Sequence, residues 1–503
     1  MAMTMEKEKG RERERQRGTP RGAKRRALRA ALGLCAFLSL SAVSAPLGGP
    51  WELAPPPCAA PSSRGATATA APGVEEAWAA VYGDVGAEEM EAVWPTSDGG
   101  FLVAGSTDSF GVGEGDAWLL KLDAAGAVEW QRTYGGPGDE YALDVREAHG
   151  GGYIVAGWTN SFGAGRDDFW VFKLDAAGGI EWEYTYGGPG SEQAWSVVPT
   201  SDGGYLVAGG TTSFGAGGAD FWVLKLDARG SVLWQRTYGG PADDGGASAF
   251  EEMVVKALED ADGNYVLASE TLSFGRGSSD IWVLKLDPQG NILWQRAYGG
   301  PDEDTLWWLV ESAQGGYLLP GVTVSFSPDL SGDLWILRID TRGDVLWQRV
   351  YGVPSEWDEA LAVGAAPDGG ALIGGYYEEG DRDWDLFLLR VDAEGTPLWQ
   401  RKWEYGWDWP TAIQPLGDGG FVVAGAAWPR PQDLDMLVLR LPADGSLGAP
   451  CANLTDFRLF QQDTRALPVD TRAVVRNTNV APQPSAATVR DTPVRPTYLC
   501  PGG

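Results

Sequence analysis

The stretch from Ser213 to Gly240 reads SFGAGGADFWVLKLDARGSVLWQRTYGG, and near copies of it recur along the chain. One copy begins at Ser161 as SFGAGRDDFWVFKLDAAGGIEWEYTYGG, and another begins at Ser273 as SFGRGSSDIWVLKLDPQGNILWQRAYGG. Each of seven copies, spaced 50 to 60 residues apart, has an acidic residue followed five positions later by a basic one. The acids are Asp116, Asp168, Asp220, Asp280, Asp333, Asp385 and Asp435. The bases are Lys121, Lys173, Lys225, Lys285, Arg338, Arg390 and Arg440. This period indicates a repeat architecture.

Each copy contains four short runs with the composition of β-strands. In the third copy they are Ala194–Thr200, Tyr205–Gly209, Phe221–Leu226 and Val232–Tyr238. The words SDGG and DARG between them are tight turns, because aspartate hydrogen-bonds back to the backbone and glycine adopts a positive φ. Four antiparallel strands per repeat, in seven repeats, predict a β-propeller, and a solenoid is the alternative.

The position of the missing strand decides between the two. The expected fourth strands contain Trp78, Trp130, Trp182, Trp234, Trp294, Trp347 and Trp399, but the seventh copy has no such tryptophan after RLPADGSLGAPC. EEAWAAVYGD, at the N-terminal end, supplies it. An N-terminal strand that completes the last blade closes a ring and removes its exposed edges, which a solenoid does not need. We therefore expect an all-β, seven-bladed β-propeller of four-stranded antiparallel blades, closed by an N-terminal strand completing the last blade.

The chain divides into four expected segments. Residues 1–45 read as an export signal, because a basic region precedes a short apolar run that ends in small residues. Residues 46–75 are a linker rich in Pro, Ala and Thr, 76–447 form the propeller, and 448–503 form an extended tail with a loose seven-residue period. We expect a secreted, periplasmic or cell-surface protein whose Cys451 and Cys500 form a disulfide, while Cys58 has no assigned partner.

The charge of the chain restricts its partners. The 503 residues carry a formal net charge of −30, and such a surface repels nucleic-acid phosphates and anionic membranes. No segment after the export signal is long and apolar enough to span a membrane. The expected partner is an extracellular glycan or protein, with no nucleic acid and no membrane-spanning segment after signal cleavage, and we expect a monomer.

A family resemblance supports the fold. KLDARGSVLW, residues 225–234, resembles the tryptophan-docking repeat of quinoprotein-like propellers, in which an Asp, a Gly and a Trp recur once per blade. The longer DFWVLKLDARGSVLWQRTYGG looks like secreted bacterial propellers of similar repeats, over roughly residues 76–447. The spacing Asp227-x2-Gly230-x3-Trp234 is one residue shorter than the quinoprotein form, and the chain lacks the adjacent cysteine pair of some quinone-dependent dehydrogenases. The resemblance therefore implies the propeller and no cofactor.

The long connections are expected on one face of the ring. In a propeller, the fourth-to-first and second-to-third connections emerge together, and here they are long words such as YGGPGSEQ and GTTSFGAGGAD. We call this the loop-rich face. Binding sites usually lie on long loops held by a rigid scaffold. Acids follow the YGG words or their equivalents there, at Glu88, Glu140, Glu192, Asp304 and Glu359.

Several copies depart from the repeat on this face. The fourth has an eight-residue insertion at 243–250, and the next three contain DEDTLWWLV, PSEWDEA and WEYGWDWP. Aromatic rings beside carboxylates suit a carbohydrate, since rings stack on sugar C–H faces and carboxylates accept hydrogen bonds from hydroxyls. The candidate ligand-binding residues are Trp307, Trp357, Asp358, Glu359, Trp407, Asp408 and Trp409. The alternative is that these tryptophans belong to the core.

Catalytic constellations are mostly absent from the sequence. Its one histidine, His149, stands at a turn position and is expected to be a surface turn residue, so no other histidine is left for a Ser-His-Asp triad or a histidine metal site. We predict no catalytic residues and no cofactor, although loop carboxylates could bind calcium. The leading hypothesis is an exported non-enzymatic propeller that binds a glycan or protein through its loop-rich face. The alternatives are a carboxylate-dependent glycoside hydrolase or lyase, and a purely structural cell-surface protein.

Overall fold

The computed structural model describes residues 77–245, 254–378, 384–403, 407–430 and 433–447, together with short stretches between 454 and 500. The predicted export signal, the linker, Cys58 and Cys451 lie outside the described residues, as does most of the insertion in the fourth copy. The described residues contain strands and connections without helices, so none of their segments is a helix able to cross a membrane.

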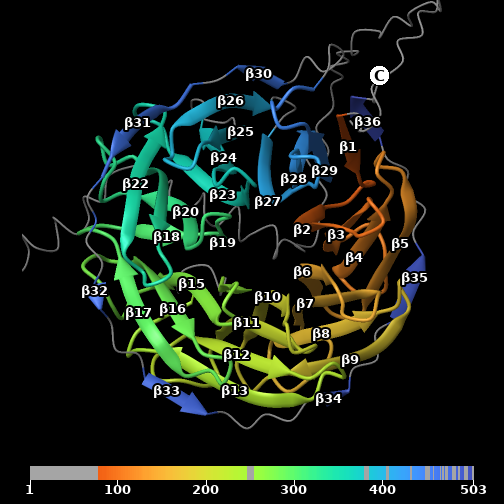
Figure 1. Cartoon of the computed structure of the whole chain (residues 1–503). Helices are drawn as coiled ribbons and strands as arrows, with labels where there is room; N and C mark the ends of the chain where they lie inside the picture. The colour runs from red at the N-terminus through yellow and green to blue at the C-terminus, as the bar shows by residue number, and fades with distance from the viewer. Residues whose placement is uncertain are drawn as a thin grey trace, which may run out of the picture. The chain divides into compact units, whose positions relative to one another are not determined.

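The strands form seven antiparallel blades arranged as a β-propeller (Figure 1). Blade 1 contains β2 (Glu88–Pro95), β3 (Phe101–Thr107), β4 (Asp116–Leu122) and β5 (Val128–Gly135). Blade 2 contains β6 (Glu140–Glu147), β7 (Tyr153–Thr159), β8 (Asp168–Leu174) and β9 (Ile180–Tyr186). Blade 3 contains β10 (Glu192–Pro199), β11 (Tyr205–Thr211), β12 (Asp220–Leu226) and β13 (Val232–Gly239). The four strands expected in the third copy are thus present, each within two residues of its predicted ends.

The later blades keep this order with local changes. Blade 4 contains β14 (Lys256–Glu259), β15 (Tyr265–Thr271), β16 (Asp280–Leu286) and β17 (Ile292–Tyr298). In blade 5 the first strand is split into β18 (Asp304–Leu306) and β19 (Val310–Glu311), followed by β20 (Tyr317–Thr323), β21 (Asp333–Ile339) and β22 (Val345–Gly352). Blade 6 contains β23 (Asp358–Ala365), β24 (Ala371–Glu378), β25 (Trp384–Val391) and β26 (Pro397–Trp403).

The ring closes as the sequence predicts. Blade 7 contains β27 (Trp407–Pro415), β28 (Phe421–Arg430), β29 (Asp433–Leu441) and, as its fourth strand, β1 (Trp78–Tyr82). β1 pairs antiparallel with β29, with Trp78 opposite Arg440 and Tyr82 opposite Met436. The first and last propeller strands therefore share one blade, and hydrogen bonds close the ring.

The C-terminal segment adds a fifth strand to every blade, which the sequence reading did not anticipate. Its strands are β30 (Leu454–Asp456), β31 (Phe460–Asp463), β32 (Val469–Asp470), β33 (Val474–Asn477), β34 (Gln483–Pro484), β35 (Thr488–Asp491) and β36 (Thr497–Cys500). They pair with the fourth strands of blades 6, 5, 4, 3, 2, 1 and 7, in that order. In Figure 1 they are the outermost blue arrows around the ring.

Neighbouring blades dock through the recurring tryptophan and tyrosine. Trp234 Nε1 donates to the Pro288 carbonyl of blade 4 at 3.1 Å, and Tyr238 Oη donates to the Gly290 carbonyl at 2.7 Å. Gly290 has φ of 78°, and a Cβ there would lie 3.0 Å from the Trp234 ring, so glycine meets both the turn and the close approach. Deeper in the interface, Phe221 and the fully buried Trp282 have ring centroids 4.7 Å apart. These aromatics are packing residues, as expected.

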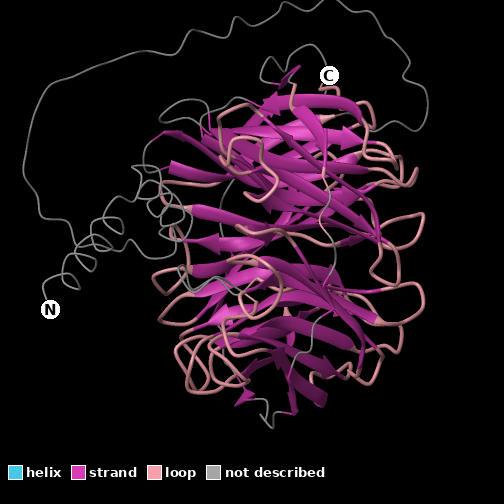
Figure 2. Ribbon diagram, turned by 90° about the vertical axis from the view of Figure 1, so that its left-hand side faces the viewer, coloured by secondary structure: helices cyan, strands magenta, loops and turns pink. Residues whose placement is uncertain are grey.

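The long connections do share one face. Gly115, in the second-to-third connection of blade 1, forms a bridge with Asp139 in the connection to blade 2, and its carbonyl accepts the Glu140 N–H at 2.9 Å. Blades 2 and 4 have the same bridge. Figure 2 shows the ring from its side, with strands running between two faces that carry the connections. The tight turns lie at the opposite strand ends, and we call that side the turn face.

Candidate functional site

Most acids of the loop-rich face hold the loops in place. Asp220, the first residue of β12, accepts hydrogen bonds from the N–H groups of Ala216 and Gly217 at 2.9 and 3.1 Å. Glu192, the first residue of β10, accepts the N–H of Gly188 at 2.7 Å. Both side chains have an exposed fraction of 0%. These carboxylates replace the water that the loop N–H groups would otherwise need, which is a structural role.

The repeated base is equally structural. Lys225 Nζ lies 2.9 Å from Asp202 Oδ1 in the SDGG turn and 2.9 Å from the Thr200 hydroxyl. Lys121 makes the matching contact with Asp98 at 3.0 Å. In these copies the aspartate of the D-x4-K/R motif therefore holds the loop before the third strand, and the lysine near the other end of that strand holds the turn between the first and second strands.

The register corrects one sequence assignment. The loop-holding acid at the start of the first strand is Glu88, Glu140, Glu192, Asp244, Asp304, Asp358 or Asp408. In blade 6 it is thus Asp358, which accepts the Val353 N–H at 2.6 Å, rather than Glu359. A shift of one residue in a strand moves a side chain to the other face of the sheet. Asp358 and Asp408 are both 0% exposed, so they lie beneath the loops, and their predicted ligand contact stays a prediction with no support from their placement.

Buried carboxyl groups meet at the boundaries between blades. A Cβ on Gly135 would lie 2.0 Å from Asp116 Oδ1 in blade 1 and 2.6 Å from Glu140 Oε2 in blade 2, so the two groups flank the same glycine. Burial raises the pKa of both. At the equivalent places, burial raises the pKa of Asp304 to about 6 and that of Asp358, beside Asp333, to about 8. These pairs hold protons at pH values where ordinary carboxyl groups have lost them.

Three of the predicted ligand-binding residues do come together, around the carboxylate of Glu359. Trp307 Nε1 donates to Glu359 Oε1, while Trp357 Nε1 and Tyr376 Oη donate to Glu359 Oε2 at 3.2 and 2.8 Å. Glu359 is 6% exposed, and the Trp307 and Trp357 side chains are half-buried. The carboxylate is therefore held rigidly, and parts of both indole rings remain accessible. We call Trp307, Trp357, Glu359 and Tyr376 the Glu359 cluster.

Blade 7 extends this cluster with a further aromatic. The half-buried Trp409 packs edge-on against Trp384, with centroids 6.1 Å apart, and Trp384 lies 5.4 Å from Tyr376. Trp407 opens β27, but its side chain is outside the described residues. Trp307, Trp357 and Trp409, from the departures of blades 5, 6 and 7, are thus connected through Glu359, Tyr376 and Trp384.

A strained loop lies beside the Glu359 cluster. Leu330 and Ser355 are non-glycine residues with φ of 62° and 68°, and the Leu330 side chain is 57% exposed. Asp329 Oδ2 accepts the Ser355 N–H at 2.7 Å, and the Trp357 ring covers Gly332 so closely that a Cβ would lie 2.3 Å from it. Left-handed backbone at such residues costs free energy and tends to occur at functional sites.

A charged cluster at the centre of the ring escaped the sequence reading. Lys256 Nζ lies 3.9 Å above the centroid of the Trp308 ring and 5.5 Å from that of Trp195. Burial lowers the pKa of Lys256 to about 8, against the opposing effects of Asp144 and Glu91. Burial raises the pKa of Glu91 to about 7, and Lys256 acts against that rise. Both groups therefore change charge near neutral pH, which suits proton transfer.

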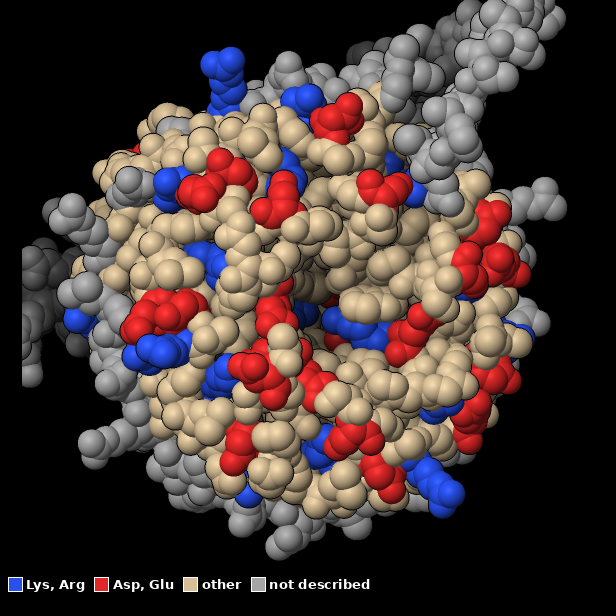
Figure 3. Space-filling view, in the orientation of Figure 1, with Lys and Arg blue, Asp and Glu red and all other residues tan. Residues whose placement is uncertain are grey.

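The neighbouring first strands supply the partners of this cluster. Asp144 and Arg146, both on β6, form an ion pair, and the Arg146 guanidinium lies 4.2 Å from the centroid of the Trp94 ring. Figure 3 shows the centre of the ring as a hollow with basic and acidic side chains at its rim. The insertion before Lys256 prevents alignment of this first strand with the others. The sequence therefore did not indicate that Lys256 faces the first strands of the neighbouring blades.

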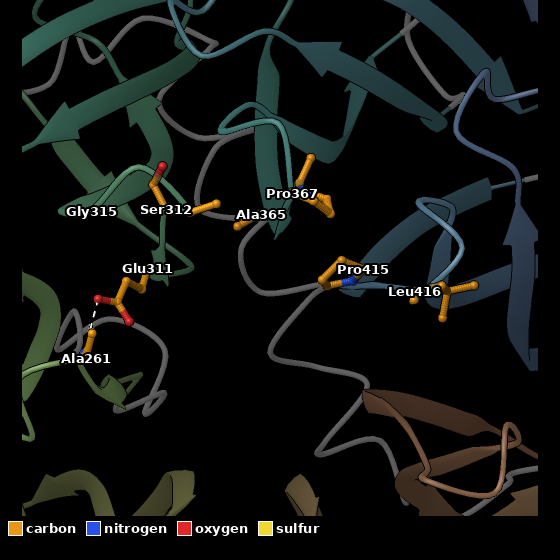
Figure 4. A pocket seen from close by; sticks show the side chains of 11 residues that line it. Ala261, Glu311, Ser312, Gly315, Ala365, Pro367, Pro415 and Leu416 are labelled. Carbon is orange, nitrogen blue, oxygen red and sulfur yellow. Dashed lines mark hydrogen bonds between the residues drawn. The ribbon is translucent and has the colours of Figure 1, made fainter.

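A second hollow opens on the turn face. It has a volume of about 640 Å³, and Figure 4 shows Glu311 at its side, where its carboxylate accepts the Ala261 N–H at 3.3 Å. It is lined by Ala261, Glu311, Ser312, Ala313, Gly315, Ala365, Ala366, Pro367, Pro415, Leu416 and Gly417. With one ionisable side chain in its lining, it offers few directional contacts. Among the described residues, no three His, Cys, Asp or Glu side chains are placed to hold a metal ion.

Comparisons with known proteins found similarity among solved structures alone. No family model matches the chain, and no curated protein matches it, so the resemblance to tryptophan-docking propellers stays a prediction. Among solved structures, puromycin hydrolase is similar over 73% of this chain and 54% of its own, with 16% identity and a TM-score of 0.43. This chain therefore spans about half the length of that enzyme.

Two other solved structures are similar over most of their length. The periplasmic gluconolactonase PpgL of Pseudomonas aeruginosa is 14% identical, with 80% of this chain and 99% of that chain covered and a TM-score of 0.43. Chaetomium thermophilum Sqt1, solved with the N-terminus of ribosomal protein L10, is 12% identical, with 70% and 88% covered and a TM-score of 0.39. At these identities and TM-scores, function must be argued from this chain's own residues.

Proposed function

We propose that this protein is exported and binds a carbohydrate at the Glu359 cluster and Trp409, without turning it over. The observation that supports this most directly is the Glu359 carboxylate, which two indole N–H groups and a phenol hold in place beside half-buried rings. A rigid carboxylate can accept hydrogen bonds from sugar hydroxyls through its remaining lone pairs, and the accessible ring faces can cover the C–H groups of a pyranose.

The test is a glycan-array screen of the full-length chain, with and without calcium. Trp357→Ala and Trp409→Ala each remove one ring from the proposed site, and we expect either to weaken binding by 10-fold or more. Trp130→Ala is the matched control, because Trp130 is also half-buried but bonds to the Ala176 carbonyl at the opposite strand end. Silence on the array, or equal losses in all three variants, would contradict the proposal and redirect the search to protein partners.

A second candidate is a glycoside hydrolase or lyase that uses carboxyl groups at the centre of the ring. The observation in its favour is Glu91, whose pKa burial raises to about 7 and which interacts with Lys256. Turnover of an array ligand that Glu91→Gln abolishes, while binding persists, would favour the enzyme. Turnover that survives this change would exclude Glu91 as the general acid.

Two parts of the proposal concern export. Cleavage after the apolar run would leave the mature chain in an oxidising compartment, where a Cys451–Cys500 disulfide could form. Cys500 ends β36, whereas Cys451 is outside the described residues. Intact-mass analysis of secreted material, before and after reduction, measures both: we expect loss of the signal residues and a gain of two mass units on reduction.

A further inference from the structure

The fifth strands follow the blades in a strict seven-residue frame. The residue opposite the third position of each WQR-type word in the fourth strands moves along the C-terminal segment in equal steps of seven. These facing residues are Asp456, Asp463, Asp470, Asn477, Pro484, Asp491 and Tyr498. Residues 454–500, here named the C-terminal strap, therefore contribute one heptad to each blade. The number of heptads equals the number of blades.

Residue types agree across this pairing. Five fourth strands carry arginine at the facing position, namely Arg132, Arg236, Arg296, Arg349 and Arg401. Opposite them in the strap stand Asp491, Asn477, Asp470, Asp463 and Asp456. Four of these five positions carry opposite charges, which stabilise an antiparallel pair when they face each other directly. Arg296 also forms an ion pair with Asp344, at 2.6 Å.

The two exceptions in the blades coincide with the two exceptions in the strap. Blade 2 carries Tyr184 at the facing position, and the strap there has Pro484. Blade 7 carries Ala80, and the strap there has Tyr498. Where arginine is missing, an acid or amide is missing too. Edge covering by a nonspecific strand would not require this agreement.

The glutamine of the WQR word forms hydrogen bonds with the backbone of the strap. Gln348 Oε1 accepts the Ala466 N–H at 2.8 Å, and Gln348 Nε2 donates to the Ala466 carbonyl at 2.9 Å. In blade 6, Gln400 Oε1 accepts the Leu459 N–H at 2.6 Å. Leu459 and Ala466 each stand three residues after a facing aspartate, and they are 8% and 4% exposed. Two successive blades thus hold the same heptad position in the same way.

We propose that the outer edges of the seven blades form a circular binding surface for a heptad-repeat strand, and that its occupant is the C-terminal strap of the same chain. The Gln–Arg pairs of five fourth strands, with Tyr184 and Ala80 at the two exceptions, determine which heptad of the strap pairs with which blade. This assigns a recognition role to the repeated WQR words, which otherwise look like packing. The strap also pairs with the outer strand of each blade. Without it, these exposed edges could pair with strands of other chains.

The test compares two deletions in the full-length chain by hydrogen–deuterium exchange. Removing seven residues, Thr471–Asn477, keeps the frame and shortens the strap by one blade. The later heptads then each move by one blade, so Pro484 faces Arg236 in β13 and Asp491 faces Tyr184 in β9. We expect β13, β9 and β5 to keep a strap strand with less protection than in the parent chain, and β1 alone to lose its strand and exchange 10-fold or more faster. Removing four residues, Thr471–Val474, breaks the frame, so β13, β9, β5 and β1 should all exchange faster. The same pattern in both variants, or unprotected fourth strands in the parent chain, would overturn the proposal.

A charge exchange tests the frame without shortening the chain. Arg132→Asp and Asp491→Arg should each raise exchange in β5 and β35 several-fold, and the double variant should restore protection, because the facing charges are again opposite. If the double variant does not restore protection, the arginine does not determine the register of the strap. Light scattering checks the occupant: a dimer whose strap protection falls on dilution would assign the strap to a second copy and overturn the assignment within one chain.

Discussion

The inner and outer edges of the blades follow opposite rules. At the outer edge, the WQR word recurs with few changes, and the C-terminal strap repeats in step with it. At the inner edge, equivalent positions of blades 2 to 5 hold Asp144, Ser196, Lys256 and Trp308. Repetition at the outer edge fits a partner that is itself repeated, whereas variation at the inner edge leaves room for one asymmetric ligand.

The largest effect should come from a residue inside a blade interface. Trp222 is fully buried, and its ring centroid lies 4.7 Å from that of Phe169 in blade 2. Trp222→Ala should lower the free energy of unfolding by ~3–5 kcal/mol through loss of burial and a cavity. Trp195→Ala, which removes a half-buried side chain at the inner edge, should lower the free energy of unfolding by less than half as much. Denaturant unfolding measures both, and equal losses would show that the inner edge is packed as tightly as the blade interfaces.

The buried carboxyl pairs should make the fold more stable in mild acid than in mild alkali. Burial raises the pKa of Asp304 to about 6 and of Asp358 to about 8, so the folded chain holds these protons more tightly than the unfolded chain. Their stabilising contribution is complete below the unfolded pKa, near 3.9, and is lost as the pH rises through 6 to 8. We expect Tm to fall between pH 5 and pH 8.

The control for this pH effect is Asp358→Asn, which keeps an oxygen for the Val353 N–H but removes the titration. This substitution should reduce the fall of Tm between pH 5 and pH 8.

Below about pH 4, Asp98 has the opposite effect on stability. Burial alone would raise its pKa, but hydrogen bonds from Thr96, Gly100 and Lys121 lower the pKa to about 2. Its contribution is lost as the pH falls from about 4 to 2. A Tm that rises from pH 5 to pH 8 would contradict the assignment of the pairs.

An intermediate effect is expected at the outer edge. Gln348→Ala removes the two hydrogen bonds to Ala466 and one from the Thr464 hydroxyl, leaving buried backbone groups unpaired. The expected loss in unfolding free energy is ~1–3 kcal/mol. Gln289→Ala, in an exposed turn, is the matched control and should change stability by less than about 0.5 kcal/mol. Similar values for the two glutamines would mean that the strap contributes nothing at blade 5.

The smallest effect belongs to the surface ion pair between Arg296 and Asp344. The carboxylate is 63% exposed, and the closest atoms are 2.6 Å apart. Asp344→Ala should cost ~0–1 kcal/mol, because water and salt screen such pairs. Thermal unfolding in low and high salt should show the difference between parent and variant shrink as salt is added. A large, salt-independent loss would mean that this aspartate also supports the frame of the strap.

Prediction from sequence succeeded where a pattern was local and repeated. The turn words, the strand alternation and the fourth-strand tryptophans each act within one blade or between neighbours, so seven copies reinforced one interpretation. The same approach gathered Trp307, Trp357 and Glu359, because departures from a repeat stand out. It aligned Glu359, instead of Asp358, with the acids that follow the YGG words, since a one-residue difference between blades is invisible until the register of β23 is known.

The sequence by itself determined the number of blades, the four strands in each, and the closure of the ring by β1, because hydrophobic period and turn chemistry are written into every copy. Tertiary structure decided what no single copy contains. It placed Lys256 over Trp308 across two blades, and it set each heptad of the strap against a distant fourth strand. Those contacts join residues far apart in the chain, so only closing the ring brings them together.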